Sequence, residues 1–229
     1  MTHCSPVKAK VSDLFVSVQG EGTFVGVRQV FVRLSGCNLN CNGCDTDYSF
    51  RFTADWKDIL DFIEQNNPIH SVAITGGEPL LQYQFLSQFL PRLKDRGYKV
   101  YLETNATLPD AYSLVANWID VVSADVKIPS VWNIGEQWDV HRRFLTQVSL
   151  KSMLIAKVVL SSKVQEKDFE PLVDLLFSIR RDMIVVLQPM WPVDELCLKI
   201  CILWQERLMR VLDKEVRVVP QVHKFLGVK

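Results

Sequence analysis

The sequence predicts an α/β fold, a partial (β/α)6-type TIM barrel with a mostly parallel, curved sheet. Apolar, β-branched runs alternate along the chain with segments whose apolar residues recur at helical spacing. About six strand–helix units of this kind imply right-handed crossovers between parallel strands. Polar motifs directly follow several of the strand-like runs. Because ligands bind beyond the carboxyl ends of the strands in such folds, we expect a site there.

The expected elements follow one another without a break. Strand-like runs cover residues 29–35, 71–75, 99–104, 120–125, 153–161, 183–189 and 216–220. Helical spacing covers residues 55–66, 80–97, 109–118, 167–181 and 193–214. No repeat, low-complexity segment or linker rich in Pro, Gly or Ser interrupts them. We therefore expect one domain over residues 1–229, a core with a short N-terminal extension and a C-terminal tail.

The composition narrows the class of protein. Of the 229 residues, 48% are apolar, and the formal net charge is zero. Nothing electrostatic therefore indicates nucleic acid or a membrane surface as a partner. The sequence shows no run of about 18 apolar residues that could span a bilayer, and no apolar signal region near its start. We expect a reducing, cytoplasmic location, where clustered cysteines favour metal binding or catalysis over disulfides.

The stretch CNLNCNGCDT, residues 37–46, places Cys37, Cys41 and Cys44 in one loop after a strand-like run. Structural zinc usually takes four ligands, and no second pair of Cys or His is visible to complete such a site. A redox CxxC pair would leave Cys37 unexplained. Three thiolates can hold three irons of a cubane cluster and leave the fourth iron open to another ligand. The spacing favours the cluster, with zinc and redox chemistry as alternatives.

The other three cysteines carry less information. Cys197 and Cys201 lie four residues apart in an amphipathic pattern, where we expect small buried side chains rather than ligands. Cys4 stands alone near the N-terminus.

The C-x3-C-x2-C spacing, followed by GGEP at residues 76–79, resembles the radical S-adenosylmethionine (SAM) superfamily. The resemblance implies a 4Fe-4S cluster whose open iron is chelated by SAM, and reductive cleavage of SAM to a 5′-deoxyadenosyl radical. It also implies that the GGEP segment binds the methionyl amine. The cofactors would perform the radical chemistry, so we assign no catalytic side chain.

A second, narrower resemblance comes from motifs along nearly the whole chain. QGEG-x3-G before the cysteines, Arg33, CDT after the last cysteine, GGEP and a terminal PQxHK occur in that order. Together they resemble the 7-carboxy-7-deazaguanine synthase family. The resemblance implies conversion of 6-carboxy-5,6,7,8-tetrahydropterin to 7-carboxy-7-deazaguanine with loss of ammonia, in 7-deazapurine (queuosine) biosynthesis. It also implies Mg2+, a homodimer and an electron donor such as flavodoxin or ferredoxin.

The family resemblance assigns site residues by position. Expected at the substrate are Val18, Gln19, Gly20, Glu21, Arg33, Thr75, Glu103, Gln221 and His223. Expected at SAM are Gly43, Cys44, Asp45, Gly77, Glu78, Ser123, Asp125, Lys127 and Gln188. Cys37, Cys41 and Cys44 would bind the cluster, and Thr46 the Mg2+. The tail that carries Gln221 and His223 is expected to cap the substrate.

Two segments depart from the family pattern. Ser123-Ala-Asp-Val-Lys127 replaces the usual Ser-Pro-Lys, so either Ser123 or Asp125 could meet the SAM ribose. ETNA replaces ET-x-G, which leaves Asn105 and Ala106 without a role. Two other functions stay open from the sequence: another radical SAM enzyme, such as a glycyl-radical activase, and a non-catalytic zinc-binding interaction module.

Overall fold

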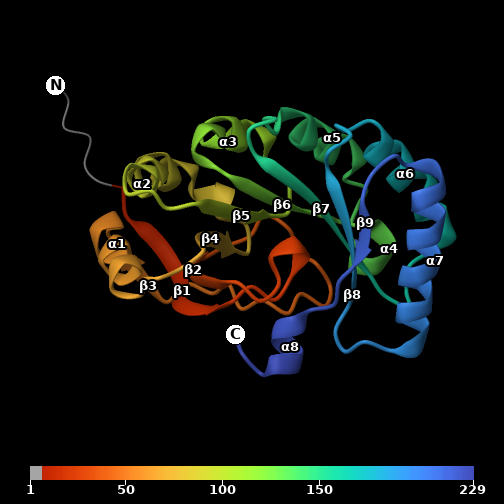
Figure 1. Cartoon of the computed structure of the whole chain (residues 1–229), viewed down its shortest axis with the longest axis horizontal. Coiled ribbons are helices and arrows are strands. Elements are labelled where there is room, and N and C mark those ends of the chain that lie inside the picture. Colours follow the sequence, from red (N-terminus) through yellow and green to blue (C-terminus); the bar gives the residue numbers. More distant parts are fainter. Residues whose placement is uncertain (1–6) are drawn as a thin grey trace.

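The protein is built on one nine-stranded sheet (Figure 1). The structure, a computed structural model, describes residues 7–229, so Cys4 lies outside the described residues. The sheet order is β3-β1-β2-β4-β5-β6-β7-β8-β9. The strands are β1 (Ala9–Val18), β2 (Arg28–Leu34), β3 (Phe52–Ala54), β4 (Ser71–Gly76), β5 (Val100–Thr104), β6 (Val121–Val126), β7 (Met153–Leu160), β8 (Ile184–Pro189) and β9 (Val216–Val218). From β2 to β9 all neighbours are parallel, whereas β1 pairs antiparallel with β2 and β3.

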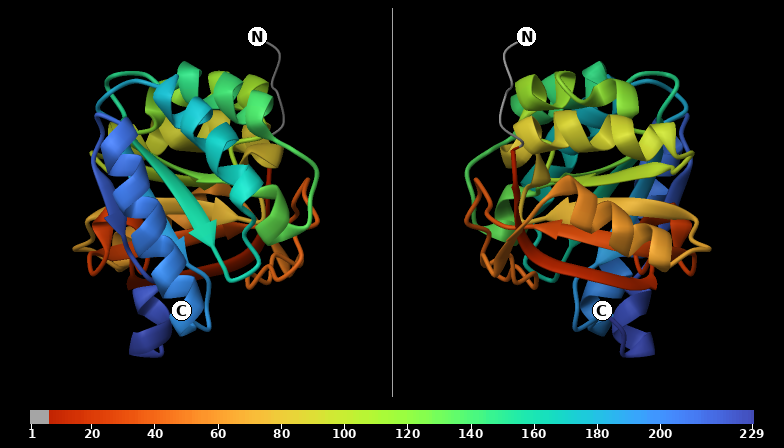
Figure 2. Two further views of the ribbon diagram at one scale, coloured as in Figure 1. Left: turned by 90° about the vertical axis from the view of Figure 1, so that its right-hand side faces the viewer. Right: turned by 90° about the vertical axis from the view of Figure 1, so that its left-hand side faces the viewer.

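Helices cover the outside of the curved sheet. They are α1 (Trp56–Gln65), α2 (Tyr83–Asp95), α3 (Pro109–Ser113), α4 (Pro129–Trp132), α5 (Trp138–Gln147), α6 (Phe169–Phe177), α7 (Glu195–Val211) and α8 (Val222–Leu226). Short 3-10 turns cover Gly22–Phe24, Pro79–Gln82, Ala116–Trp118 and Glu166–Asp168. Helices α1, α2, α3, α5, α6 and α7 surround the sheet, and α8 lies apart from them on the opposite side (Figures 1 and 2). No helix within residues 7–229 combines the length and apolarity needed to cross a membrane.

The predicted α/β class is confirmed, but the predicted runs did not include β1, β3, α4, α5 or α8. Strand β1 was not among the predicted runs because Lys10, Ser12, Asp13 and Ser17 interrupt its apolar residues. The cysteine loop therefore follows the second strand of the chain, not the first. Helix α5 was also not predicted. It is rich in charged and polar residues, and its few buried residues lie on one side of the helix.

Alternation of side chains along the parallel strands separates the core from the site. Outward-facing Val, Ile and Leu residues pack under the helices in one large apolar core. The inner face holds a smaller apolar group of Phe31, Ala73, Tyr101, Val121, Ile155 and Val186. Two residues further along each of these strands the inner face becomes polar, with Arg33, Thr75, Glu103, Ser123, Lys157 and Gln188. The apolar group thus forms a floor below a polar cavity.

The two cysteines of α7 behave as expected. Cys197 and Cys201 are both buried, and the Cys197 thiol donates to the Leu160 carbonyl at 3.2 Å. They are part of the packing between α7 and the sheet.

Candidate active site

A cavity of about 480 Å³ opens at the carboxyl ends of the parallel strands. Its volume lies in the range of small-molecule sites. All but one of the residues expected at substrate, SAM or metal line it. They are Val18, Gln19, Gly20, Glu21, Arg33, Cys37, Cys41, Gly43, Cys44, Asp45, Thr46, Thr75, Gly77, Glu103, Ser123, Asp125, Lys127, Gln188, Gln221 and His223. The exception is Glu78.

The cysteine loop forms one wall of this cavity. Cys37, Cys41 and Cys44 are free thiols, and burial raises the pKa of Cys37 and of Cys41. Within residues 7–229, no three Cys, His, Asp or Glu side chains converge where a single metal ion could bind. A cubane cluster does not need such convergence, because each thiolate binds a different iron. Three free thiols that share one cavity wall are therefore a donor set that fits a 4Fe-4S cluster.

The GGEP segment lies directly against the cysteine loop. A Cβ at Gly77 would be 2.7 Å from the Cβ of Cys37 and 2.5 Å from the Gly36 carbonyl oxygen. The Glu78 backbone N–H donates to that same carbonyl at 2.9 Å. Only glycine permits this approach, so the motif brings bare backbone to the cavity beside the thiols.

The Glu78 side chain points behind the cavity wall, where it is fully buried. Its carboxylate accepts the backbone N–H of Leu80 at 3.0 Å and of Asn105 at 2.7 Å, and the Thr104 hydroxyl at 2.9 Å. Burial raises its pKa to about 7 despite these hydrogen bonds. The carboxylate thus ties the GGEP turn to the end of β5. A direct contact of Glu78 with SAM remains a prediction, and its carboxylate is not at the cavity surface.

On the other wall, β6 and β8 present hydrogen-bond acceptors. Asp125 Oδ2 pairs with Lys127 at 3.1 Å and with Lys157 at 3.3 Å. Burial alone would raise the pKa of Asp125, but the two ammonium groups lower it. Asp125 Oδ1 and Gln188 Oε1 are buried without a partner in the described part of the chain. Both side chains line the cavity, so their free oxygens can accept from the donors of a bound ligand.

The QGEG segment forms the end of the cavity nearest β1. Gln19 Nε2 donates to Glu103 at 2.8 Å, and its Oε1 accepts the Glu21 backbone N–H at 3.0 Å. Both bonds fix the Gln19 amide. The Arg33 guanidinium lies 5.1 Å from the centre of the Phe15 ring, and its Nε is buried without a partner among residues 7–229. This free donor in a cavity suits an anionic ligand group.

Lys157 was not expected at the site, although it lines the cavity. It projects from β7 and pairs with Glu21 at 2.5 Å as well as with Asp125. Its side chain is only 13% exposed. Burial alone would lower the pKa of Lys157, but Asp125, Glu21 and Glu103 raise it well above the usual value. The sequence signal was a single lysine within the apolar run MLIAKVVL.

The C-terminal tail contacts the QGEG segment and the cysteine loop. Gln221 Nε2 donates to Glu21 Oε1 at 2.7 Å and to Asp45 Oδ2 at 3.3 Å. Lys224 pairs with the same Asp45 oxygen at 2.9 Å. The Val222 backbone N–H donates to the Gly20 carbonyl at 2.8 Å. The tail therefore brings His223 to the cavity wall, on the side of the sheet where α8 is seen in Figure 1.

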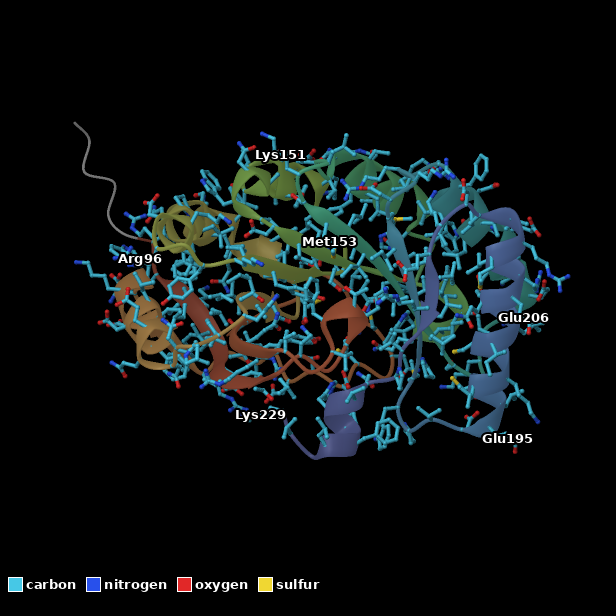
Figure 3. All side chains as sticks on the ribbon, viewed as in Figure 1. Arg96, Lys151, Met153, Glu195, Glu206 and Lys229 are labelled. Atoms are coloured by element: carbon cyan, nitrogen blue, oxygen red, sulfur yellow. The ribbon has the colours of Figure 1, made fainter. Side chains whose placement is uncertain are left out.

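Two further contacts hold the tail. The Ser17 hydroxyl of β1 donates to the Lys229 carbonyl at 2.8 Å, and Figure 3 shows Lys229 beyond α8, at the edge of the molecule near β1. The Phe225 ring packs edge-on against Trp191, with ring centres 5.0 Å apart. Trp191 is 40% exposed and lines the cavity.

A thiol-lined cavity at the carboxyl ends of a partial barrel defines the class as radical SAM. A profile of the Radical SAM superfamily matches residues 31–132. The 7-carboxy-7-deazaguanine synthase of Geobacter sulfurreducens is 35% identical, covering 96% of this chain and 97% of that one. That of Methanopyrus kandleri is 37% identical, covering 94% and 92%. The chain belongs to the 7-carboxy-7-deazaguanine synthase family of radical SAM enzymes.

A solved structure supports the fold. The crystal structure of QueE from Escherichia coli matches with a TM-score of 0.62 at 22% identity, covering 94% of this chain and 95% of that one. Family membership brings a 4Fe-4S cluster and SAM as cofactors. Family membership supports neither of the two alternatives that the sequence left open, the zinc-binding module and the glycyl-radical activase.

Proposed function

We propose that this protein converts 6-carboxy-5,6,7,8-tetrahydropterin to 7-carboxy-7-deazaguanine, with loss of ammonia, in 7-deazapurine (queuosine) biosynthesis. The observation that carries the proposal is one cavity lined by the thiol loop, by the half-buried cation Arg33 with its unpartnered Nε, and by a row of amide and carboxylate groups. A flat, polar heterocycle with a carboxylate needs this combination. The names of the relatives from G. sulfurreducens and M. kandleri support the same reaction.

The SAM side of the cavity is the wall formed by the cysteine loop, GGEP, β6 and β8. Once bound, the cluster and SAM supply a carbon radical that removes a hydrogen atom from the substrate. Gly77 offers its backbone there, and Asp125 Oδ1 and Gln188 Oε1 offer two acceptors for SAM hydroxyl or amino groups. Because Asp125 keeps a free oxygen, we favour it over Ser123 at the ribose. Gly43, Asp45 and Lys127 complete this wall.

The substrate side is the wall formed by β1, β2 and the tail. Arg33 binds the substrate carboxylate. The Gln19 amide and the Glu21 and Glu103 carboxylates form hydrogen bonds along the edge of the pterin. Lys157 and Gln221 keep the Glu21 carboxylate ionised: burial would raise its pKa, but these partners lower it. An ionised Glu21 can accept hydrogen bonds from ring N–H and amino groups.

Thr46 is the residue that would hold Mg2+ in this proposal. A hydroxyl is a weak ligand, so substrate oxygens and water must supply most of the coordination. Thr46 lines the cavity next to Asp45, whose Oδ2 is held by Lys224 and Gln221. Mg2+ would therefore arrive with the substrate carboxylate.

The remaining proposals concern the whole molecule. Residues 1–229 form a single radical SAM core domain whose C-terminal tail caps the substrate, supported by the contacts of Gln221 and Lys224. A flavodoxin or ferredoxin delivers the electron in a reducing cytoplasm. A homodimer is the expected assembly, and exposed apolar residues of α7, Leu196 and Leu203 among them, offer a surface for it. Light scattering of the anaerobic holoenzyme tests this.

The decisive experiment is anaerobic turnover of the pterin with SAM, Mg2+ and a reductant, followed by detection of 7-carboxy-7-deazaguanine. Cys41→Ala should lose the cluster and all SAM cleavage. Arg33→Ala should keep the cluster and raise KM for the pterin about tenfold to a hundredfold, since a charge-assisted hydrogen bond contributes about 1.5–3 kcal/mol. Wild-type KM in Arg33→Ala contradicts the carboxylate assignment, and absence of product from the wild-type holoenzyme overturns the proposed function.

A further inference from the structure

Asn105, at the end of β5, lies beside the cysteine loop with its whole side chain hydrogen bonded. Its Oδ1 accepts the Thr107 backbone N–H at 3.1 Å and the Thr107 hydroxyl at 2.6 Å. Its Nδ2 donates to Asn38 Oδ1 at 2.9 Å and lies 3.8 Å from Cys37 Sγ. A flipped amide would set Nδ2 against the Thr107 N–H, two donors face to face. The amide nitrogen must therefore face the thiol.

The backbone around Asn105 is fixed as firmly. Its N–H donates to Glu78 Oε2, as described above. The next residue, Ala106, has φ of 55°, in the left-handed region that disfavours residues with a Cβ. Its N–H donates to the Thr104 hydroxyl at 3.1 Å, and its carbonyl lies 3.3 Å from Nδ1 of the buried His141. Contacts on both sides hold this turn in place, so Asn105 cannot swing away from the cysteine.

Cys37 differs from the other two cysteines in these contacts. Its sulfur accepts from Asn105 and from the Leu39 backbone N–H at 3.4 Å. Among the hydrogen bonds of residues 7–229, none brings an N–H donor to the sulfur of Cys41 or Cys44. Hydrogen bonds to the thiolates are one of the means by which a protein sets the potential of an iron–sulfur cluster.

We propose that Asn105 is a positioning residue that donates an N–H···S hydrogen bond to the Cys37 thiolate and raises the reduction potential of the 4Fe-4S cluster. Reduction adds one negative charge to the cluster. A donor at the thiolate stabilises the more negative state, which makes the electron easier to deliver. This gives a role to the ETNA segment, whose Asn and Ala the sequence left unassigned. The inference rests on the cluster of the proposed function and not on its substrate.

The test compares the midpoint potential of the reconstituted holoenzyme across variants, by anaerobic redox titration followed by electron paramagnetic resonance. Asn105→Ala removes the donor, and Asn105→Asp keeps the acceptor for Thr107 while replacing the donor with an oxygen. Thr107→Val is the matched control: it removes the hydroxyl that contacts both Asn105 and Asn38, but it keeps the Asn105 amide and the Thr107 N–H that donates to its Oδ1. We expect a more negative potential for Asn105→Ala, a still more negative one for Asn105→Asp, and little change for Thr107→Val.

Iron content separates the outcomes. About four irons per chain in the Asn105 variants with a wild-type potential overturns the inference and leaves the proposed function standing. The inference is also overturned if both Asn105 variants fold but hold no cluster, because the residue would then serve assembly. A wild-type protein that holds no cluster overturns the proposed function itself, and the inference with it.

Discussion

Lys157→Met is the substitution with the largest effect expected in the cavity. The ammonium pairs with Glu21 at 2.5 Å and Asp125 at 3.3 Å, and all three side chains are less than a fifth exposed. Removing one partner of a buried pair costs about 3–5 kcal/mol, because the other charge stays buried without compensation. For a chain of this length that corresponds to a fall in melting temperature of about 6–20 °C.

The pH dependence gives a second, signed result. In the wild type the pKa of Glu21 is lowered, so its stabilising contribution is present above its unfolded pKa and is lost as the pH falls. Without Lys157, burial dominates and raises that pKa. A raised pKa favours the folded state at low pH, and this advantage disappears as the pH rises through the raised value. The difference in unfolding free energy between wild type and variant should therefore grow from about pH 5 to pH 8.

Chemical unfolding of the cluster-free proteins, followed by circular dichroism, measures both effects. Lys199→Met is the matched control. Its partner Glu195, 2.6 Å away, lies at the end of α7 where the helix begins (Figure 3), and the Lys199 and Glu195 side chains are 70% and 83% exposed. An exposed pair contributes only about 0–1 kcal/mol. Lys157 does not neutralise buried carboxylates if Lys157→Met lowers the free energy of unfolding no more than Lys199→Met does. The same conclusion follows if the loss caused by Lys157→Met does not depend on pH.

Two further substitutions test the tail and the GGEP turn. A Cβ in Gly20→Ala would lie 2.6 Å from the Cβ of His223, so α8 must shift. Steady-state kinetics of this variant should show a higher KM for the pterin, with the cluster intact. Adding His223→Gly to the Gly20→Ala variant should relieve the clash and restore the KM. The pKa of Glu78 is raised to about 7. Its contribution to the free energy of unfolding, about 3 kcal/mol, is therefore present below pH ~4.5 and is lost as the pH rises through about 7. In unfolding titrations at several pH values, Glu78→Gln should abolish this pH dependence of the unfolding free energy.

The fold was predictable because the parallel strands are buried on both faces. Runs such as SVAIT and MIVVLQP contain little besides apolar residues, and the spacing between them matches helices. Strand β1 was not predicted because one of its faces lines the cavity and carries polar residues. Local pattern alone does not distinguish such a strand from a loop.

The site was predictable where motifs are local and was missed where partners come from distant segments. The cysteines, QGEG and the tail were found by their own spacing. The contact of Asn105 with Cys37 joins residues 68 positions apart, and its geometry depends on Thr107 and Asn38. Lys157 carried a usable signal, because a lone lysine at an inward position of a buried strand must find a carboxylate partner.

The register of the sheet is what turns separate strands into one site. Pairing places Arg33 beside Thr75 and Glu103 beside Ser123, and it places Asp125, two residues further along β6, beside Lys157, so that inward polar residues of neighbouring strands meet in pairs. A slip of one residue in β7 would turn Lys157 into the apolar layer under the helices and bring Val158 into the cavity. Burial of outward-facing residues such as Val158 prevents this slip. The apolar core therefore specifies the site as well as the fold, since it fixes which charges meet across the cavity.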